Sequence, residues 1–142
     1  MDRNGSAAAR ILLERGYDVM GIILRLKPDN AADADISDAQ RIADKLGIEL
    51  RVLDRRDFFK KSVIEPFVSE YLSARTPNPC VLCNRKFKFR LLAEMADRLG
   101  CQWMATGHYV QVEEKDDFAY LLMGDDVRKD QSYFLWRVPQ QT

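Results

Sequence analysis

The stretch Val19-Met20-Gly21-Ile22-Ile23-Leu24-Arg25-Leu26 decides the fold of this 142-residue chain. It is an apolar run rich in Ile and Leu, and such a run is typical of a strand that is covered on both faces. Helices are predicted on either side of it. Ser6–Arg15 has apolar residues at helical spacing and stops at Gly16, and the capping box Ser37-Asp38-Ala39-Gln40 opens a helix that ends at Gly47.

The alternation of strands and helices continues along the chain. Further elements are expected at Ile48–Leu53 (strand), Phe58–Leu72 (helix, with a kink or break at Pro66), Phe87–Leu99 (helix ending at Gly100), Trp103–Ala105 (strand leading to a tight turn at Thr106-Gly107), and Tyr109–Val112 with Phe118–Met123 (hairpin). This pattern predicts an α/β fold, a parallel sheet with helices on both faces. Ligands of such sheets bind at the carboxyl ends of the strands, so Leu24, Thr106 and Gly107 are expected near a nucleotide.

Composition limits the classes of protein to which the chain can belong. At this length a single domain is expected. The 22 basic and 22 acidic residues cancel, so any contact with nucleic acid must come from local patches. No apolar run approaches the length of a membrane span, and the N-terminus lacks a secretory pattern. Three cysteines, an odd number, fit the reducing cytosol better than a disulfide framework.

The chemistry of the chain is concentrated in the stretch Arg75–Phe89, which reads RTPNPCVLCNRKFKF. Two prolines make its first part extended, and it then carries Cys80 and Cys83 three residues apart. A thiol just before a helix, close to several basic side chains, is favoured as the thiolate. We therefore expect a presented, reactive cysteine rather than a buried one.

Other interpretations of the two cysteines exist. A zinc site needs four ligands, and beyond carboxylates the chain offers only Cys101 and His108 in addition. A thioredoxin-type redox pair is expected at a strand-to-helix turn near the start of a fold. The two prolines before Cys80 are unlike that arrangement. Cys83 can also be an inert residue in a turn, Cys101 is expected to be buried filler, and His108 a structural histidine.

Three motifs carry a resemblance to a known family. TPNPCVLCNRKFKF is followed by Ala105-Thr106-Gly107-His108-Tyr109 and by Lys129-Asp130-Gln131-Ser132-Tyr133-Phe134-Leu135. In this order and spacing they closely resemble the tRNA-specific 2-thiouridylases of the PP-loop ATP pyrophosphatase superfamily. The resemblance extends from about Ser6 to Arg137. It implies a Rossmann-like HUP domain that belongs to the adenine nucleotide alpha hydrolase-like folds.

The resemblance also implies a reaction. ATP adenylates the C2 oxygen of the wobble uridine of tRNA, and a persulfide sulfur then displaces AMP. The residues implied are Cys83 as the catalytic cysteine, Asn78, Pro79 and Cys80 at the target base, Lys129, Asp130 and Gln131 at the tRNA, and Ser6, Leu24 and Gly107 at ATP. The simpler interpretations are that Leu24 fills the core, that Gly107 supplies a turn, and that Lys129–Gln131 is a solvated turn.

ATP, with Mg²⁺, and tRNA are the expected ligands, and the expected partner is a persulfide donor, either a cysteine desulfurase or a sulfur relay protein. The expected location is the cytoplasm. Iron–sulfur ligation by Cys80 and Cys83 is a weaker alternative, since a four-ligand cluster would need Cys101 or non-protein ligands. The basic residues Arg85, Lys86, Lys88 and Arg90 interleave with Phe87 and Phe89. We expect these aromatic side chains in the core rather than stacked on bases.

The chain departs from the family at both ends. The family begins with a strand and a glycine-rich phosphate loop, which are reduced here to Asn4-Gly5-Ser6. A distal persulfide cysteine and later domains would follow Thr142. We therefore expect a partial domain that binds ATP weakly or not at all and does not catalyse alone. It could be a fragment, a sequence with a wrongly assigned start, a decayed copy, or a silent paralogue that binds RNA or a protein partner. Another adenylating enzyme of this fold is disfavoured by the TPNP–CxxC segment.

Overall fold

The computed structural model describes residues 3–26 and 31–139. Its internal contacts divide the chain into two units. One comprises Met1–Lys61 with Ala105–Gly107, and the other comprises Ser62–Met104 with His108–Thr142. Each unit is described by itself.

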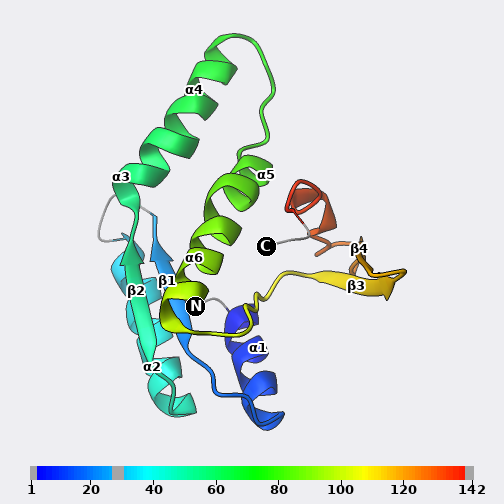
Figure 1. The fold of residues 1–142 in the computed structure, drawn as a ribbon. Helices are drawn as coiled ribbons and strands as arrows, with labels where there is room; N and C mark the ends of the chain where they lie inside the picture. The colour runs from blue at the N-terminus through cyan, green and yellow to red at the C-terminus, as the bar shows by residue number, and fades with distance from the viewer. Residues whose placement is uncertain (1–2, 27–30, 140–142) are drawn as a thin grey trace. The chain divides into compact units, whose positions relative to one another are not determined.

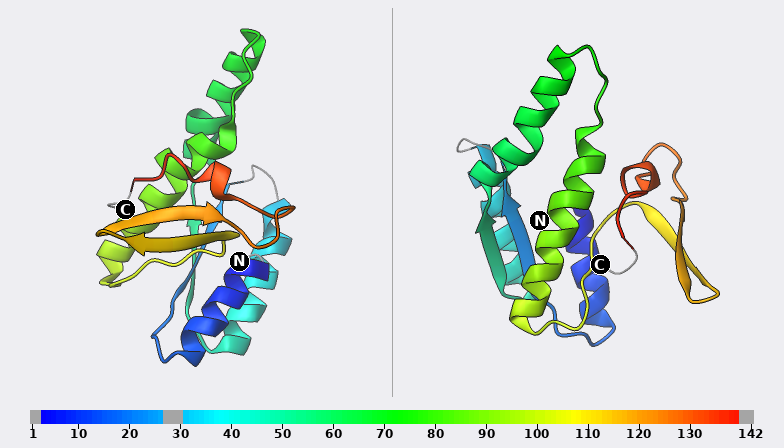
Figure 2. Two further views of the ribbon diagram at one scale, coloured as in Figure 1. Left: turned by 90° about the vertical axis from the view of Figure 1, so that its right-hand side faces the viewer. Right: turned by 45° about the horizontal axis from the view of Figure 1, so that its top comes forward.

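The first unit contains the parallel sheet. Its elements are α1 (Arg3–Glu14), β1 (Gly21–Arg25), α2 (Ala31–Leu46), β2 (Leu50–Asp54) and α3 (Arg56–Phe59). The two strands pair in parallel, from Gly21 opposite Leu50 to Arg25 opposite Asp54, and helix α2 packs along them (Figure 1). Helix α1 packs on α2, which Figure 2 shows from two further sides. The prediction of an α/β fold with a parallel sheet and helices is confirmed.

The core of this unit forms where the two helices meet the start of the sheet. Ala9 of α1, Ala43 of α2 and Ile48 form a buried cluster, since small side chains let the helices approach closely. Both helices end at a glycine in the left-handed region, with φ of 83° at Gly16 and 69° at Gly47. The predicted ends of these helices are therefore correct.

Two predicted elements differ from the structure. Helix α2 is already formed at Ala31, so Ser37 lies inside it and does not open it. The alanine-rich segment before Ser37 has a high helix propensity, which outweighs the local capping pattern. The segment Trp103–Ala105 is not a strand. A strand needs a hydrogen-bonded neighbour, and within the described ranges only β1 pairs with β2 and β3 with β4.

The second unit consists of helices and a hairpin. A π-helical turn, η1 (Lys60–Ile64), precedes α4 (Glu65–Leu72), and α5 (Pro79–Cys83), η2 (Asn84–Lys88) and α6 (Phe89–Leu99) follow one another without interruption. The predicted break at Pro66 thus corresponds to η1, with the proline in the first turn of α4. Helix α6 ends at Gly100, whose φ is 67°, as predicted.

The hairpin is formed by β3 (Val110–Lys115) and β4 (Phe118–Met123). It pairs antiparallel from Val110 opposite Met123 to Lys115 opposite Phe118. The two connecting residues, Asp116 and Asp117, both have positive φ, as a two-residue turn of type I′ requires. The predicted hairpin is confirmed: the second strand has the predicted bounds, and the first extends to Lys115, which makes the turn tighter. The 3₁₀ turn η3 (Ser132–Phe134) follows it.

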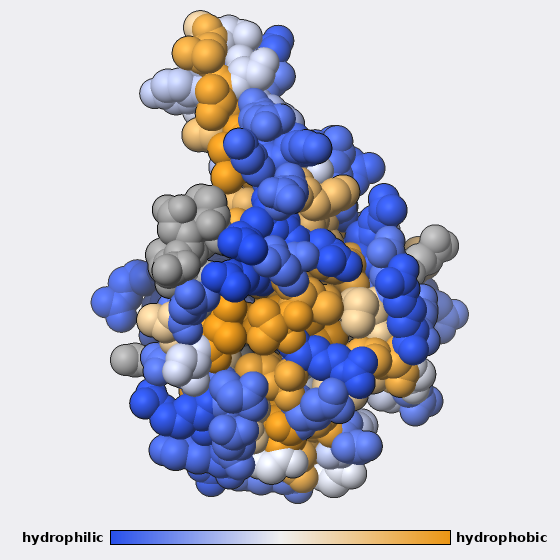
Figure 3. Space-filling model, turned by 90° about the vertical axis from the view of Figure 1, so that its left-hand side faces the viewer, coloured by the Kyte–Doolittle hydropathy of each residue, from blue (hydrophilic) through white to orange (hydrophobic). Residues whose placement is uncertain are grey.

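Apolar side chains remain exposed along α4. Phe67, Val68, Tyr71 and Leu72 are each at least 36% exposed, and together they form a stripe that is visible in Figure 3. In the part of the chain that the structure describes, no helix is long and apolar enough to cross a bilayer.

Candidate functional site

Asn78 fixes the start of the cysteine segment. Its Oδ1 atom accepts hydrogen bonds from the backbone N–H groups of Cys80 at 3.1 Å and of Val81 at 3.3 Å. Pro79 takes the first helical position, where its missing N–H costs nothing. The sequence Asn-Pro therefore begins helix α5 at a defined residue and places Cys80 in its first turn, exposed to solvent.

Cys83 lies one turn further along the helix and is buried, with 6% of its surface exposed. Burial raises the pKa of its thiol, Cys80 adds to this rise, and the positive charge of Lys88 opposes it. The prediction of a presented Cys83 thiolate is therefore wrong for this structure. The physical reason is that Cys83 does not precede a helix, because α5 continues through η2 into α6 and turns this residue inward.

The other two cysteines also differ from what the sequence indicated. All three thiols are free, and Cys80 and Cys101 are the exposed ones. The expectation that Cys101 is buried filler is wrong. It follows the glycine that ends α6, and its backbone N–H bonds to Ala96 O at 2.8 Å, which holds the residue in the exposed turn beyond the helix.

Asn84 connects the first motif with the third. It is 4% exposed, and its Nδ2 atom donates to the backbone oxygen of Phe134 at 3.1 Å, across 50 positions of the sequence. Its Oδ1 atom is buried and has no hydrogen-bond partner among the described residues. The amide therefore joins the thiol-bearing helix to the segment that contains Lys129, Asp130 and Gln131.

Asp130 and Gln131 hold that segment against the hairpin. The carboxylate of Asp130 accepts from the N–H of Gly124 at 2.8 Å and from the hydroxyl of Ser132 at 2.8 Å, and these bonds lower its pKa. Gln131 exchanges two bonds with Tyr109, each 2.9 Å long, one through its side chain and one through its backbone N–H. Both residues are thus engaged within the protein.

Lys129 is the member of the triplet whose side chain extends toward solvent. Its Nζ atom lies 3.4 Å from a carboxylate oxygen of Asp126 and 5.6 Å from the ring centre of Tyr109, with 58% of the side chain exposed. Such a weak, exposed pair leaves the ammonium group accessible to a phosphate.

The aromatic residues of the basic segment lie largely inside. Phe87 is 3% exposed, which confirms its prediction as a core residue. Phe89 is half-buried and stacks on the ring of His108, with the centroids 5.6 Å apart. Arg85 and Lys86 point outward, and in the described part of the chain neither forms an ion pair.

The residues expected at ATP belong to the first unit. Leu24 is half-buried near the carboxyl end of β1, and Gly107 lies in a segment without regular structure. Ser6 lies within α1, which already begins at Arg3. The expectation of a reduced phosphate loop at Asn4-Gly5-Ser6 is therefore wrong, because these residues are helical.

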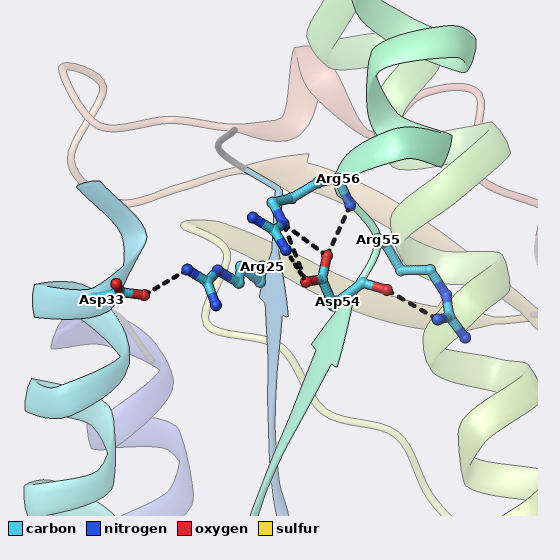
Figure 4. A network of polar contacts seen from close by, with 5 residues as sticks. All are labelled: Arg25, Asp33, Asp54, Arg55 and Arg56. Atoms are coloured by element: carbon cyan, nitrogen blue, oxygen red, sulfur yellow. Dashed lines mark hydrogen bonds and ion pairs between the residues drawn. The ribbon is translucent and has the colours of Figure 1, made fainter. Parts of the chain in front are cut away.

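A network of charged groups occupies the carboxyl ends of β1 and β2 (Figure 4). Arg25 pairs with Asp33 of α2 at 2.6 Å, and Arg56 pairs with Asp54 at 2.6 Å. The hydrogen bonds from the Arg56 guanidinium are the largest cause of the lowered pKa of Asp54. The Nε atom of Arg25 is buried and has no partner among the described residues. An N–H without a partner suits an acceptor such as a phosphate oxygen. The negative charges of Asp33 and Asp54, in contrast, repel a phosphate.

In the described ranges no group of three or more His, Cys, Asp or Glu side chains lies close enough to hold a metal ion. Iron–sulfur ligation by Cys80 and Cys83 stays a prediction. Sequence reasoning missed Asn84 and the Arg25 network. No local pattern indicated Asn84, because the predicted helix begins only at Phe87 and the partner of the amide lies 50 positions away.

Comparisons with known proteins agree with the three motifs. The family model of the tRNA methyl transferase HUP domain matches residues 3–142. The chain is 47% identical over 137 residues to tRNA-specific 2-thiouridylase MnmA 3 of Bacteroides fragilis, which covers 96% of the chain and 36% of that protein. It is 48% identical over 143 residues to tRNA-specific 2-thiouridylase MnmA of Syntrophotalea carbinolica, with 97% and 41% covered. The chain thus spans less than half the length of these relatives.

Proposed function

Because this chain belongs to the tRNA methyl transferase HUP domain family, we propose that it is the nucleotide-binding domain of a tRNA 2-thiouridylase. In this proposal ATP, with Mg²⁺, adenylates the C2 oxygen of the wobble uridine of a tRNA. A persulfide sulfur from a donor protein then attacks C2, and AMP leaves with the oxygen. A thiolate, for which we propose Cys83, next attacks the inner sulfur of the persulfide, which breaks the S–S bond, releases 2-thiouridine and leaves a disulfide between Cys83 and the donor cysteine. The proposed location is the cytoplasm.

One observation carries the proposal. The hydrogen bond from Asn84 to Phe134 joins the cysteine motif to the Lys129–Leu135 motif within one unit. These two motifs are far apart in the sequence, and the buried amide that joins them supports a function that uses both together. In relatives named tRNA-specific 2-thiouridylase the matched region includes both motifs.

The proposed roles of the cysteine segment and of the ATP residues rest on the resemblance to the family, and those of Lys129, Asp130 and Gln131 rest also on their exposure and hydrogen bonds. Cys83 acts as the thiol beside the target base, and Asn78, Pro79 and Cys80 form the first turn that the base meets. Lys129 contacts the tRNA backbone, whereas Asp130 and Gln131 keep Lys129 in place through the hairpin. Leu24 and Gly107, which both belong to the first unit, contact ATP in this proposal.

A chimera tests this function. Residues 3–142 would replace the matching region of the Bacteroides fragilis relative, because the chain covers only part of such proteins. The chimera would be incubated with tRNA, ATP and a persulfide donor, and 2-thiouridine would be measured by mass spectrometry of the nucleosides. We expect ATP-dependent thiolation that is lost in the Cys83→Ser chimera, with nucleotide binding retained.

The unmodified relative is the positive control, and circular dichroism checks that the chimera folds. A folded chimera that binds tRNA but forms no 2-thiouridine would contradict the enzyme assignment and favour the silent paralogue. Thiolation that persists in Cys83→Ser would instead refute the role of this thiol.

A further inference from the structure

The two cysteines of helix α5 have opposite environments at a spacing that permits a covalent bond. Cys80 and Cys83 are three residues apart in one helical turn. Their Cα atoms are therefore about 5 Å apart, from the rise and radius of a helix. Disulfides join Cα atoms that are about 4.4–6.8 Å apart. The Cβ atoms of residues three apart on a helix are about 5–6 Å apart, whereas those of a disulfide are about 3.5–4.5 Å apart, so the first turn of α5 has to tighten for this pair to join.

The difference in exposure gives the two thiols different roles. Cys80 is exposed and can meet a molecule from solution, whereas Cys83 is 6% exposed and is shielded from one. Val81, which is 5% exposed, fixes the buried side of the same turn, and the cap at Asn78 fixes its beginning. A group attached to Cys80 therefore lies close to the thiol of Cys83, which is shielded from solvent.

We propose that Cys80 and Cys83 are a thiol–disulfide exchange pair, in which Cys80 reacts with a low-molecular-weight disulfide and Cys83 resolves the adduct. Cys101, the third cysteine, has no second cysteine within a helical turn, and it provides an internal comparison. The pair does not depend on the proposed tRNA reaction, although its oxidised form would withhold the Cys83 thiol from that reaction.

The reaction balances with oxidised glutathione. The thiolate of Cys80 attacks one sulfur of glutathione disulfide, which forms a mixed disulfide at Cys80 and releases one glutathione thiolate. The thiolate of Cys83 then attacks the Cys80 sulfur, which forms the Cys80–Cys83 bond and releases the second glutathione. The protein loses two electrons and two protons, and one glutathione disulfide becomes two glutathione thiols.

The experiment uses the whole chain under native conditions. The reduced protein is incubated with oxidised glutathione, quenched with acid, alkylated with N-ethylmaleimide in denaturant, and digested with trypsin. Cleavage after Arg75 and Arg85 gives one peptide, 76–85, that holds both Cys80 and Cys83, and cleavage after Arg98 and Lys115 gives a peptide with Cys101. Peptide mass spectrometry therefore reads the pair and the comparison cysteine separately.

We expect peptide 76–85 to lose the mass of two hydrogens and carry neither glutathione nor maleimide, while Cys101 keeps a glutathione adduct. In Cys83→Ser and in Cys83→Ala, Cys80 should hold a lasting adduct, and in Cys80→Ser, Cys83 should be found with maleimide only. Circular dichroism confirms that each variant is folded. A lasting adduct at Cys80 of the unaltered chain, with Cys83 alkylated, would overturn the proposal, and this measurement needs no variant.

Discussion

At the scale of single residues, the burial of Cys83 sets its reactivity. Because burial raises the pKa of this thiol, little thiolate is present near neutral pH. We predict that iodoacetamide labels the exposed Cys80 and Cys101 before Cys83. Labelling of Cys83 should accelerate as the pH rises above the ordinary thiol range of about 8.5, because deprotonation then supplies the nucleophile.

Quenched time points followed by peptide fragmentation measure this order. Cys80→Ser allows Cys83 to be followed alone in its peptide, and Cys101 serves as the exposed reference in the same sample. If Cys83 reacts first at neutral pH, the inward position of its side chain is wrong.

Asn84 is the residue whose substitution tests the connection between the two motifs. Asn84→Ala leaves the backbone oxygen of Phe134 without its donor, so we predict a loss of about 1–3 kcal/mol in the free energy of unfolding. Asn84→Asp should cost more than Asn84→Ala, because it places a carboxylate against the same oxygen in a buried site. Urea denaturation at neutral pH measures both.

The control for these variants is Arg85→Ala at the exposed neighbouring position, which should change the stability little. Equal stability of Asn84→Ala and the unaltered chain would show that the amide contributes nothing to the connection.

The sequence predicted the residue types of the candidate site better than their environments. The motif located Cys80 and Cys83, but the spacing could not show that the helix continues past Cys83 and turns it inward. The bond from Asn84 to Phe134 depends on the folding of segments 50 positions apart, so no local pattern could reveal it. Burial and pKa follow from such tertiary contacts.

At the scale of elements, the carboxylate of Asp130 anchors the hairpin to the turn that follows it. We predict that Asp130→Ala lowers the hydrogen-exchange protection of the Gly124 and Ser132 amides, which donate to this carboxylate. The pKa of Asp130 is lowered, first by the Gly124 bond and then by the Ser132 hydroxyl. Its contribution is therefore present above the ordinary carboxyl pKa of about 3.9 and is lost as the pH falls through the lowered value.

Protection factors measured by mass spectrometry or NMR over this pH range provide the test. Asp97→Ala on helix α6 is the matched control, since Asp97 is exposed and no side-chain bond of it is seen in the described part of the chain. If the hydrogen-exchange protection of the Gly124 amide is unchanged in Asp130→Ala, the Asp130 carboxylate does not anchor the hairpin.

The elements themselves followed the local rules where those rules are strong. Gly16, Gly47 and Gly100 end helices at positive φ, because only a residue without a Cβ adopts that conformation freely. The capping box at Ser37 failed because helix propensity extends upstream of it. The predicted strand at Trp103–Ala105 failed for a different reason, since a strand depends on a neighbour that composition alone cannot supply.

At the scale of the whole molecule, the α/β class was predictable because alternating apolar runs and amphipathic segments depend only on periodicity. The grouping of contacts into two units was not, since it depends on which long-range contacts form. The predicted site residues divide between these units. Leu24 and Gly107 belong to the first, and Cys83 and Lys129 belong to the second.

Because the acidic and basic residues are equal in number, RNA affinity must come from local groups of cations. Lys86 is exposed and forms no ion pair within the described ranges, whereas Arg90 is held by Glu94 at 2.9 Å. We predict that Lys86→Ala weakens the binding of an anticodon stem-loop and reduces the slope of log affinity against log salt by about 0.7–0.9, the value for one lost phosphate contact. Arg90→Ala should change both less.

Fluorescence anisotropy with a labelled stem-loop at several salt concentrations measures these slopes. Lys129→Ala should have the same effect as Lys86→Ala, because the pair of Lys129 with Asp126 is weak and exposed. Arg90 is the comparison because its pair with Glu94 is shorter, at 2.9 Å, than the 3.4 Å pair of Lys129 with Asp126. If Arg90→Ala lowers the slope as much as Lys86→Ala does, the ion pairs of the free protein do not determine which cations meet the RNA. The position of a basic residue on the helix, rather than the absence of an ion pair, would then determine whether it contacts the RNA.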